Sequence, residues 1–152
     1  MRKLVSLFVV IVSLIAMSIS CFAENWEYVT KNTNGSEYYI DRDSAYCLDR
    51  DDKNFKCSVM VATVFSEFDS VDNAVNGFGF PMHRWRGRAS HSLEKYTFND
   101  KKGKLRYKRE GEIVYDSQGN ILYTAPSQMF FNKLESGTVL YSIYVSVKAI
   151  VK

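Results

Sequence analysis

The sequence is poor in the residues that carry metal chemistry or staple small folds. Among 152 residues there are two histidines, three cysteines and two prolines. His83 and His91 lie eight positions apart with no cluster of carboxylates beside them, which is too sparse for a zinc site. No internal repeat, low-complexity tract or further long apolar run follows residue 23. We therefore predict that the residues after position 23 form one ordinary domain with no transmembrane helix.

An excess of charge of one sign is also missing. Twenty lysines and arginines face seventeen acids, for a formal net charge of +3. Arg2 and Lys3 lie within residues 1–23, which contain no acid, so removal of these residues would leave a net charge of +1. This balance gives no support to a nucleic-acid partner. No spacing of serine, histidine and aspartate nominates a catalytic triad, and we predict neither an enzyme nor a cofactor.

The first 23 residues have the features of a secretory signal peptide. A basic start is followed by an apolar run from Leu4 to Ile19 and by the small residue Ala23. We therefore predict a signal peptide at residues 1–23 and a single exported domain at residues 24–152, located in the periplasm, at the outer-membrane surface or in the medium. The alternatives are an uncleaved anchor and a lipid anchor on Cys21, which lacks the leucine expected three residues before it.

Two cysteines, Cys47 and Cys57, remain in the predicted mature chain. A hairpin centred on Asp52 places them directly opposite each other on neighbouring strands. Opposed residues of a non-hydrogen-bonded pair lie about 4.5 Å apart at Cα, within reach of a disulfide. Because exported proteins meet oxidising conditions, we predict that the two form a disulfide bond.

Alternation of apolar and polar residues predicts a series of short antiparallel strands. Asn34-Gly35 predicts a tight hairpin that pairs Thr30 with Tyr39. The polar segment 41–44 is interpreted as a bend. The charged segment 49–54 is interpreted as a solvated turn, because it lacks the ligand spacing of a calcium loop. The predicted strands cover residues 25–31, 37–41, 46–48, 55–65, 88–98, 104–115 and 121–124, and the strand at 55–65 is expected to be buried on one face at its start and on both later.

The C-terminal segment, residues 136–152, fits two periods equally well. Val139, Ile143 and Val147 belong to an apolar helical stripe, for which Ser136 would be the N-cap. The same valines and isoleucine also fit strict alternation, and their β-branched side chains favour a strand. Periodicity alone leaves helix and strand open.

Several features spread over the chain form a recognisable pattern: Trp26, the run Tyr39-Ile40-Asp41 followed by Ser44, the strand at 59–65, the basic strand at 104–109, residues 111–114 and Ser136-Gly137 before the tail. In this pattern the chain resembles the bacterial surface-adhesin E family of small exported proteins. The resemblance implies an α+β fold, an antiparallel meander of about six strands with a C-terminal helix packed on it, and so favours a helix for the tail. It also implies a surface role, because family members include adhesins that bind host matrix proteins.

The irregular segment 69–87 is where a compact β-rich domain would place a binding surface. Its end is rich in cations around one tryptophan, a combination that suits an anionic partner through bidentate and cation–π contacts. The alternative is a solvated loop whose tryptophan folds back on the core. The predicted binding residues are His83, Arg84, Trp85, Arg86 and Arg88.

These features predict an exported, non-catalytic binding protein with a protein or anionic glycan as its partner. Our first hypothesis is a surface adhesin for host matrix protein or glycan. The second is a periplasmic accessory or inhibitor protein that binds a bacterial partner. The third is a small-molecule carrier, with haem considered because of Met82, His83 and His91.

Overall fold

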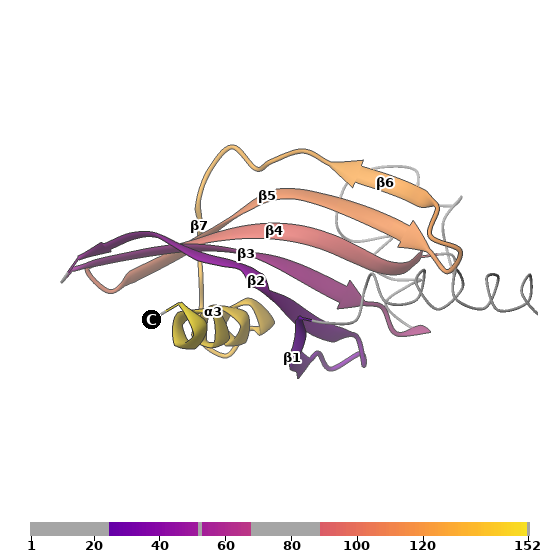
Figure 1. The fold of residues 1–152 in the computed structure, drawn as a ribbon, viewed down its shortest axis with the longest axis horizontal. Helices are drawn as coiled ribbons and strands as arrows, with labels where there is room; N and C mark the ends of the chain where they lie inside the picture. The colour runs from indigo at the N-terminus through magenta and orange to yellow at the C-terminus, as the bar shows by residue number, and fades with distance from the viewer. Residues whose placement is uncertain (1–24, 52, 68–88, 152) are drawn as a thin grey trace, which may run out of the picture.

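The computed structural model describes residues 25–51, 53–67 and 89–151, which form one antiparallel sheet and one helix (Figure 1). The first six strands follow one another as a meander, and the short seventh strand pairs with β5. This arrangement confirms the predicted α+β fold with its six-strand meander and C-terminal helix. The elements are β1 (Trp26–Lys31), β2 (Glu37–Asp51), β3 (Asn54–Val64), β4 (Ala89–Lys101), β5 (Lys104–Asp116), β6 (Ile121–Ala125), β7 (Asn132–Lys133) and α3 (Val139–Ile150).

β3 supplies the centre of the core. Its alternate residues from Phe55 to Val61 are buried on the face that α3 covers, as alternation predicted. Burial on both faces near its end is wrong, because Val64 is 44% exposed. The remaining core comes from neighbouring strands and the helix: Ile40, Tyr96, Phe98, Leu134, Ile143, Tyr144 and Val147.

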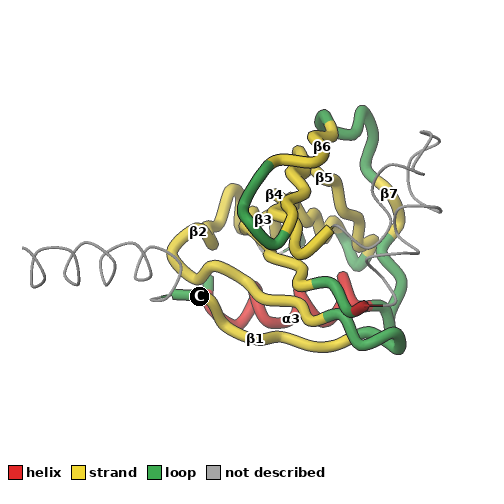
Figure 2. The backbone as a smooth tube through the Cα atoms, turned by 90° about the vertical axis from the view of Figure 1, so that its right-hand side faces the viewer, coloured by secondary structure: helices red, strands yellow, loops and turns green. Residues whose placement is uncertain are grey.

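The tail is a helix, and it contacts β1, β2 and β3 (Figure 2). Its N-cap is Thr138, whose Oγ1 accepts a hydrogen bond from the Tyr141 amide at 3.2 Å. The predicted cap at Ser136 is wrong because Gly137 first takes a left-handed φ of 82°, which turns the chain before the helix starts. Within the described ranges, no helix is long and apolar enough to cross a membrane.

β2 continues through the segment predicted to be a bend. Its register with β3 is irregular between Asp41 and Tyr46, where the chain bulges instead of leaving the sheet. Ser44 stabilises the irregularity: its hydroxyl donates to the Asp41 carbonyl at 2.7 Å and accepts from the Met60 amide at 2.8 Å. A side chain therefore satisfies a backbone donor that the bulge leaves without a strand partner.

The first hairpin forms where Asn34-Gly35 predicted it, but with a different register. Thr30 pairs with Tyr38 and not with Tyr39, because a β-bulge shifts the register between Tyr28 and Thr30. Gly35 has a φ of 94°, whereas Asn34 keeps a negative φ. The loop is instead closed by Asn32, whose Oδ1 accepts from the amides of Asn34 at 3.0 Å and Ser36 at 2.9 Å.

Cys47 and Cys57 are register partners across β2 and β3, as predicted, but the predicted disulfide is wrong for this structure: both are free thiols. The register shifts between Cys47 and Asp49. Cys47 is exposed, and its thiol donates along its own strand to the Asp49 carbonyl at 3.6 Å. Cys57 is fully buried in the core. Burial raises the pKa of its thiol to about 12.

The two thiols should therefore react at very different rates with an alkylating reagent. At pH about 8 a thiol with a pKa near 12 is only about one part in ten thousand thiolate, and burial adds a barrier to access. We expect iodoacetamide to label Cys47 rapidly in the folded protein and Cys57 only after unfolding. Peptide mass spectrometry locates the label. Failure of Cys47 to react until a reductant is added would contradict the free-thiol arrangement.

Candidate functional site

The turn of the β2–β3 hairpin and the turn of the β4–β5 hairpin lie side by side at one end of the sheet (Figure 1). In a meander, alternate turns share an edge, and Asn54 of β3 is the register partner of Lys101 of β4. The Lys102 amide donates to the Lys53 carbonyl at 2.8 Å and ties the two turns together. Cationic side chains 49 positions apart in the sequence are thereby brought to one place.

The β4–β5 turn has an unusual residue at its first central position. Lys102 has a φ of 52° and Gly103 a φ of 75°, the pattern of a type I′ two-residue hairpin turn. Glycine takes a positive φ without strain, whereas a lysine there costs roughly 1 kcal/mol. Lys102 is the only described non-glycine residue with a positive φ. A strained cation at a turn tip is a feature that function can explain.

The two turns and the helix enclose a hollow of about 650 Å³. Its floor is Phe55, which is 7% exposed and belongs to the core. Arg50 and Lys148 lie over this ring, at 5.5 Å and 5.4 Å from its centroid. Four cations and two carboxylates are among the lining residues, which are Arg50, Asp51, Lys53, Asn54, Phe55, Asp100, Lys102, Gly103 and Lys148.

Both carboxylates of the hollow are engaged within the protein. Asp51 Oδ1 accepts from the amides of Lys53 and Asn54, each at 2.7 Å, and the Lys53 hydrogen bond is the main cause that lowers the pKa of Asp51. Asp100 accepts from the Tyr144 hydroxyl at 3.1 Å and pairs with Lys148 at 3.7 Å.

The cations of the hollow form fewer ion pairs and hydrogen bonds within the protein than its carboxylates do. Lys148 donates to the Tyr144 hydroxyl at 3.0 Å, which is the main cause that raises the pKa of Lys148 and keeps it charged at neutral pH. No ion pair forms at Arg50, Lys53 or Lys102 within the described ranges. Three charges thus remain for a ligand, and the hollow favours an anion.

A second hollow of about 290 Å³ lies at the opposite end of the sheet and is lined by apolar atoms of Trp26, Tyr39, Ala62, Val64 and His91. Burial lowers the pKa of His91, so the ring is neutral at pH 7. The volume lies at the lower limit of the range of about 300–1,000 Å³ typical of small-molecule pockets, and few polar atoms line it to orient a ligand. This hollow therefore gives little support to the carrier hypothesis.

On the same face of the sheet as α3, but farther along the strands, β4 and β5 bury two carboxylates beside one guanidinium. Arg109 Nη1 lies 2.7 Å from Glu112 Oε2 and 3.9 Å from Glu94 Oε2. Tyr96 donates its hydroxyl to Glu94 Oε2 at 2.5 Å. Burial, and then the charge of Glu94, raises the pKa of Glu112 to about 7.

Buried groups with shifted pKa values are candidates for catalysis, but this cluster has a simpler explanation. Glu94 Oε1 accepts from the hydroxyls of Ser92 on its own strand at 3.1 Å and of Thr63 on β3 at 3.2 Å, so its lone pairs are used within the sheet. None of the cluster lines either hollow. We interpret it as a polar part of the fold. Sequence reasoning missed it because Ser92 and Glu94 are polar residues that lie on the buried face of β4 together with Tyr96.

The predicted binding residues His83, Arg84, Trp85, Arg86 and Arg88 lie outside the described residues, so the predicted loop surface stays a prediction. The residues of the basic hollow were not predicted. The available signal was two cation-bearing turns separated by one hairpin, which a meander brings to the same edge. The described part of the chain also contains no group of three or more His, Cys, Asp or Glu that could hold a metal ion.

Comparison with models of protein families, with curated proteins and with solved structures finds no match to this chain. The resemblance to the surface-adhesin E family therefore rests on the residue pattern alone. A function has to be argued from the chemistry of the hollow and of the surfaces around it.

Replacing the buried Glu112 should change how stability depends on pH. Its pKa of about 7 lies above the ordinary 4.5, so between these values the folded protein keeps a proton that the unfolded chain releases. Its contribution to stability is complete below about pH 4.5, falls as pH rises to about 7 and is lost above. Glu112→Gln should therefore be more stable than the parent at pH about 8.5, by up to roughly 3 kcal/mol, and similar at pH about 5.

Urea denaturation followed by fluorescence at both pH values measures this difference. The control is Glu135→Gln, which removes an exposed carboxylate that pairs with Lys133 at 3.2 Å. It should leave the pH dependence unchanged. The same pH dependence in the parent and in Glu112→Gln would show that Glu112 is ionised like an ordinary surface acid.

Proposed function

We propose that this chain is an exported, non-catalytic binding protein whose basic hollow holds the anionic groups of a sulfated glycan. The observation that supports this most is the set of four cations around the Phe55 floor, contributed by two hairpin ends and a helix, while both nearby carboxylates are engaged. Arginine offers a planar fork to a sulfate or carboxylate, and lysine offers a mobile point charge. Both kinds are present at the hollow.

The lining supports binding more than chemistry. Among its described residues there is no serine, cysteine or histidine, and its lysines and aspartates lie at an open surface. Its carboxylates are used within the fold, Asp51 in the turn and Asp100 in the contact with the helix. An open basic hollow beside an aromatic ring suits a chain that presents several anionic groups in succession.

A surface role for this binding rests on the predicted leader and on the resemblance to the adhesin family. In that role the glycan belongs to a host surface. The alternative is a periplasmic accessory protein that uses the same hollow for an acidic segment of a bacterial partner. Surface labelling of intact cells separates these two locations, because only the first exposes the protein to a reagent that does not cross the outer membrane.

Removing two cations from the hollow should weaken binding of a sulfated oligosaccharide. We choose Lys53→Ser with Lys102→Gly, because glycine accepts the positive φ at 102 and relieves strain. Each lost charge-assisted hydrogen bond contributes about 1.5–3 kcal/mol, so the Kd should rise at least roughly tenfold. Calorimetry at low ionic strength gives the Kd, and the parent affinity should fall as salt rises.

The matched control is Lys31→Ser with Lys133→Ser, which removes two exposed cations elsewhere and gives the same net charge. Its Kd should stay within about twofold of the parent, since distant exposed charges are screened. Equal weakening by both double variants would reduce the effect to net charge. Absence of binding to the parent at low salt would overturn the glycan proposal.

A further inference from the structure

The loop between β6 and β7 holds out two large apolar side chains. Met129 is 84% exposed and Phe130 is 75% exposed, the highest values among the exposed large apolar residues of the described chain. Single exposed apolar residues are common on proteins, whereas two adjacent ones at a loop tip are typical of an interaction site.

The exposure is built into the fold, because the loop is anchored on both sides of its tip. Before the tip, Gln128 donates its amide to the Arg109 carbonyl at 2.8 Å, and its Oε1 accepts from the Arg109 amide at 3.1 Å. After the tip, Asn132 and Lys133 pair with β5 as strand β7. A loop fixed this closely to the sheet presents its tip with little ordering left to occur on binding.

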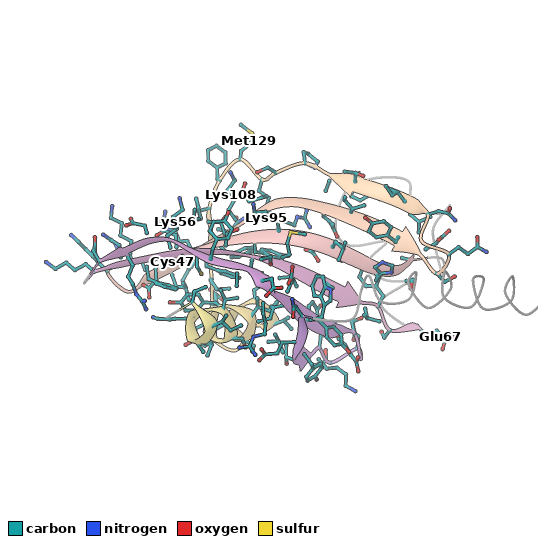
Figure 3. The ribbon with its side chains drawn as sticks, in the orientation of Figure 1. Cys47, Lys56, Glu67, Lys95, Lys108 and Met129 are labelled. Atoms are coloured by element: carbon teal, nitrogen blue, oxygen red, sulfur yellow. The ribbon has the colours of Figure 1, made fainter. Side chains whose placement is uncertain are left out.

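Three lysines lie on the sheet face beneath this tip. Lys56, Lys95 and Lys108 come from β3, β4 and β5, and Figure 3 shows them with Met129 on the side of the sheet opposite α3. Side chains on that face of each strand share one direction because the period of a strand is two. We call this set, with the two tip residues, the tip–lysine face.

Two of the three ammonium groups make no ion pair within the described part of the chain, although Lys95 also hydrogen-bonds the side chain of Tyr46. Lys56 Nζ lies 6.0 Å from the centroid of Phe131, and Lys95 Nζ lies 5.7 Å from that of Tyr46. Neither forms an ion pair with a described residue. Lys108 is partly neutralised by Glu110 at 3.3 Å.

Other charges near this face have a mixed sign. Asp49 is the register neighbour of Lys56 across β2 and β3, while Arg106 and Lys133 are register partners across β5 and β7. Lys133 pairs with Glu135 at 3.2 Å. The cations on this face therefore exceed the acids.

From this arrangement we infer that the tip–lysine face docks the protein on a bilayer containing anionic phospholipid. Met129 and Phe130 enter the boundary between headgroups and acyl chains, while Lys56 and Lys95 contact headgroup phosphates. A bilayer containing anionic phospholipid has an outer layer of charged headgroups over an apolar layer of acyl chains. An apolar tip with cations set back behind it matches this order of layers. A protein partner is the weaker fit. The anchor residues of a protein partner usually fill pockets, and neither hollow of the described chain includes Met129 or Phe130.

This surface is independent of the basic hollow. The hollow uses Lys53 and Lys102 at the hairpin ends, whereas Lys56 points to the other face of the sheet and the tip belongs to another loop. The failure of one proposal would leave the other standing.

Co-sedimentation of the purified full-length protein with vesicles tests the inference. The probes are vesicles of phosphatidylcholine and vesicles of phosphatidylcholine mixed with phosphatidylglycerol. We expect binding to the mixed vesicles only, weakened by added salt. Met129→Ser with Phe130→Ser should lower the partition coefficient at least roughly tenfold, because both side chains lose their apolar burial. Lys56→Gln with Lys95→Gln should lower it severalfold and flatten its salt dependence.

Two controls keep the result specific. Ile121→Ser with Val145→Ser removes two apolar side chains that are 61% and 48% exposed elsewhere, and should leave vesicle binding unchanged. The hollow variant, Lys53→Ser with Lys102→Gly, should also bind vesicles like the parent. Circular dichroism of each variant confirms that the fold is intact.

Three results would overturn the inference. The first is no binding of the parent protein to the mixed vesicles. The second is equal weakening by the tip variant and the Ile121/Val145 control. The third is a folded tip variant that binds vesicles like the parent, because binding would then be electrostatic adsorption alone.

Discussion

The unbroken pairing of β3 with β4 is the constraint on which the rest of the molecule depends. Eleven consecutive register pairs run from Asn54–Lys101 to Val64–His91 without a bulge, whereas the strand pairs on either side, β2–β3 and β4–β5, each contain irregularities. Because this register is continuous, it sets three things at once. It aligns the core residues Val59 and Tyr96 on the helix face, it brings the turns at Lys53 and Lys102 together, and it directs Lys56 to the opposite face.

The same face of the sheet is used in two ways along its length. Near the hairpin ends it is apolar and covered by α3, which buries Ile143, Tyr144 and Val147 against the strands. Farther along β4 it buries Glu94 in a network of hydroxyls and Arg109. A buried carboxylate network contributes little net stability compared with a packed apolar core, but each of its hydrogen bonds holds a specific register. The polar part therefore adds to the definition of the fold more than to its free energy.

Sequence reasoning found what alternation and turn chemistry encode locally. The buried face of β3, the opposition of Cys47 and Cys57 and the positions of most turns followed from residues close together in the chain. It missed what depends on bulges, such as the register of the first hairpin and the continuity of β2, because a bulge is a single extra residue that shifts every later partner. It also missed the free thiols of Cys47 and Cys57, which lie opposite each other as predicted. The basic hollow was missed for another reason: its residues are ordinary turn residues until the meander places two turns at one edge. The tail needed the family resemblance, since its valines fit both periods.

The central claim is that the β3–β4 register joins two hairpin ends into an anion-binding hollow. Amide chemical-shift mapping by NMR during titration with a sulfated oligosaccharide tests it most directly, because it reports every backbone position in one experiment. The account predicts that the largest shifts fall on both hairpin ends and on the end of α3, at Arg50, Lys53, Phe55, Lys102 and Lys148. Shifts confined to one hairpin end, or concentrated on residues far from both, would contradict it.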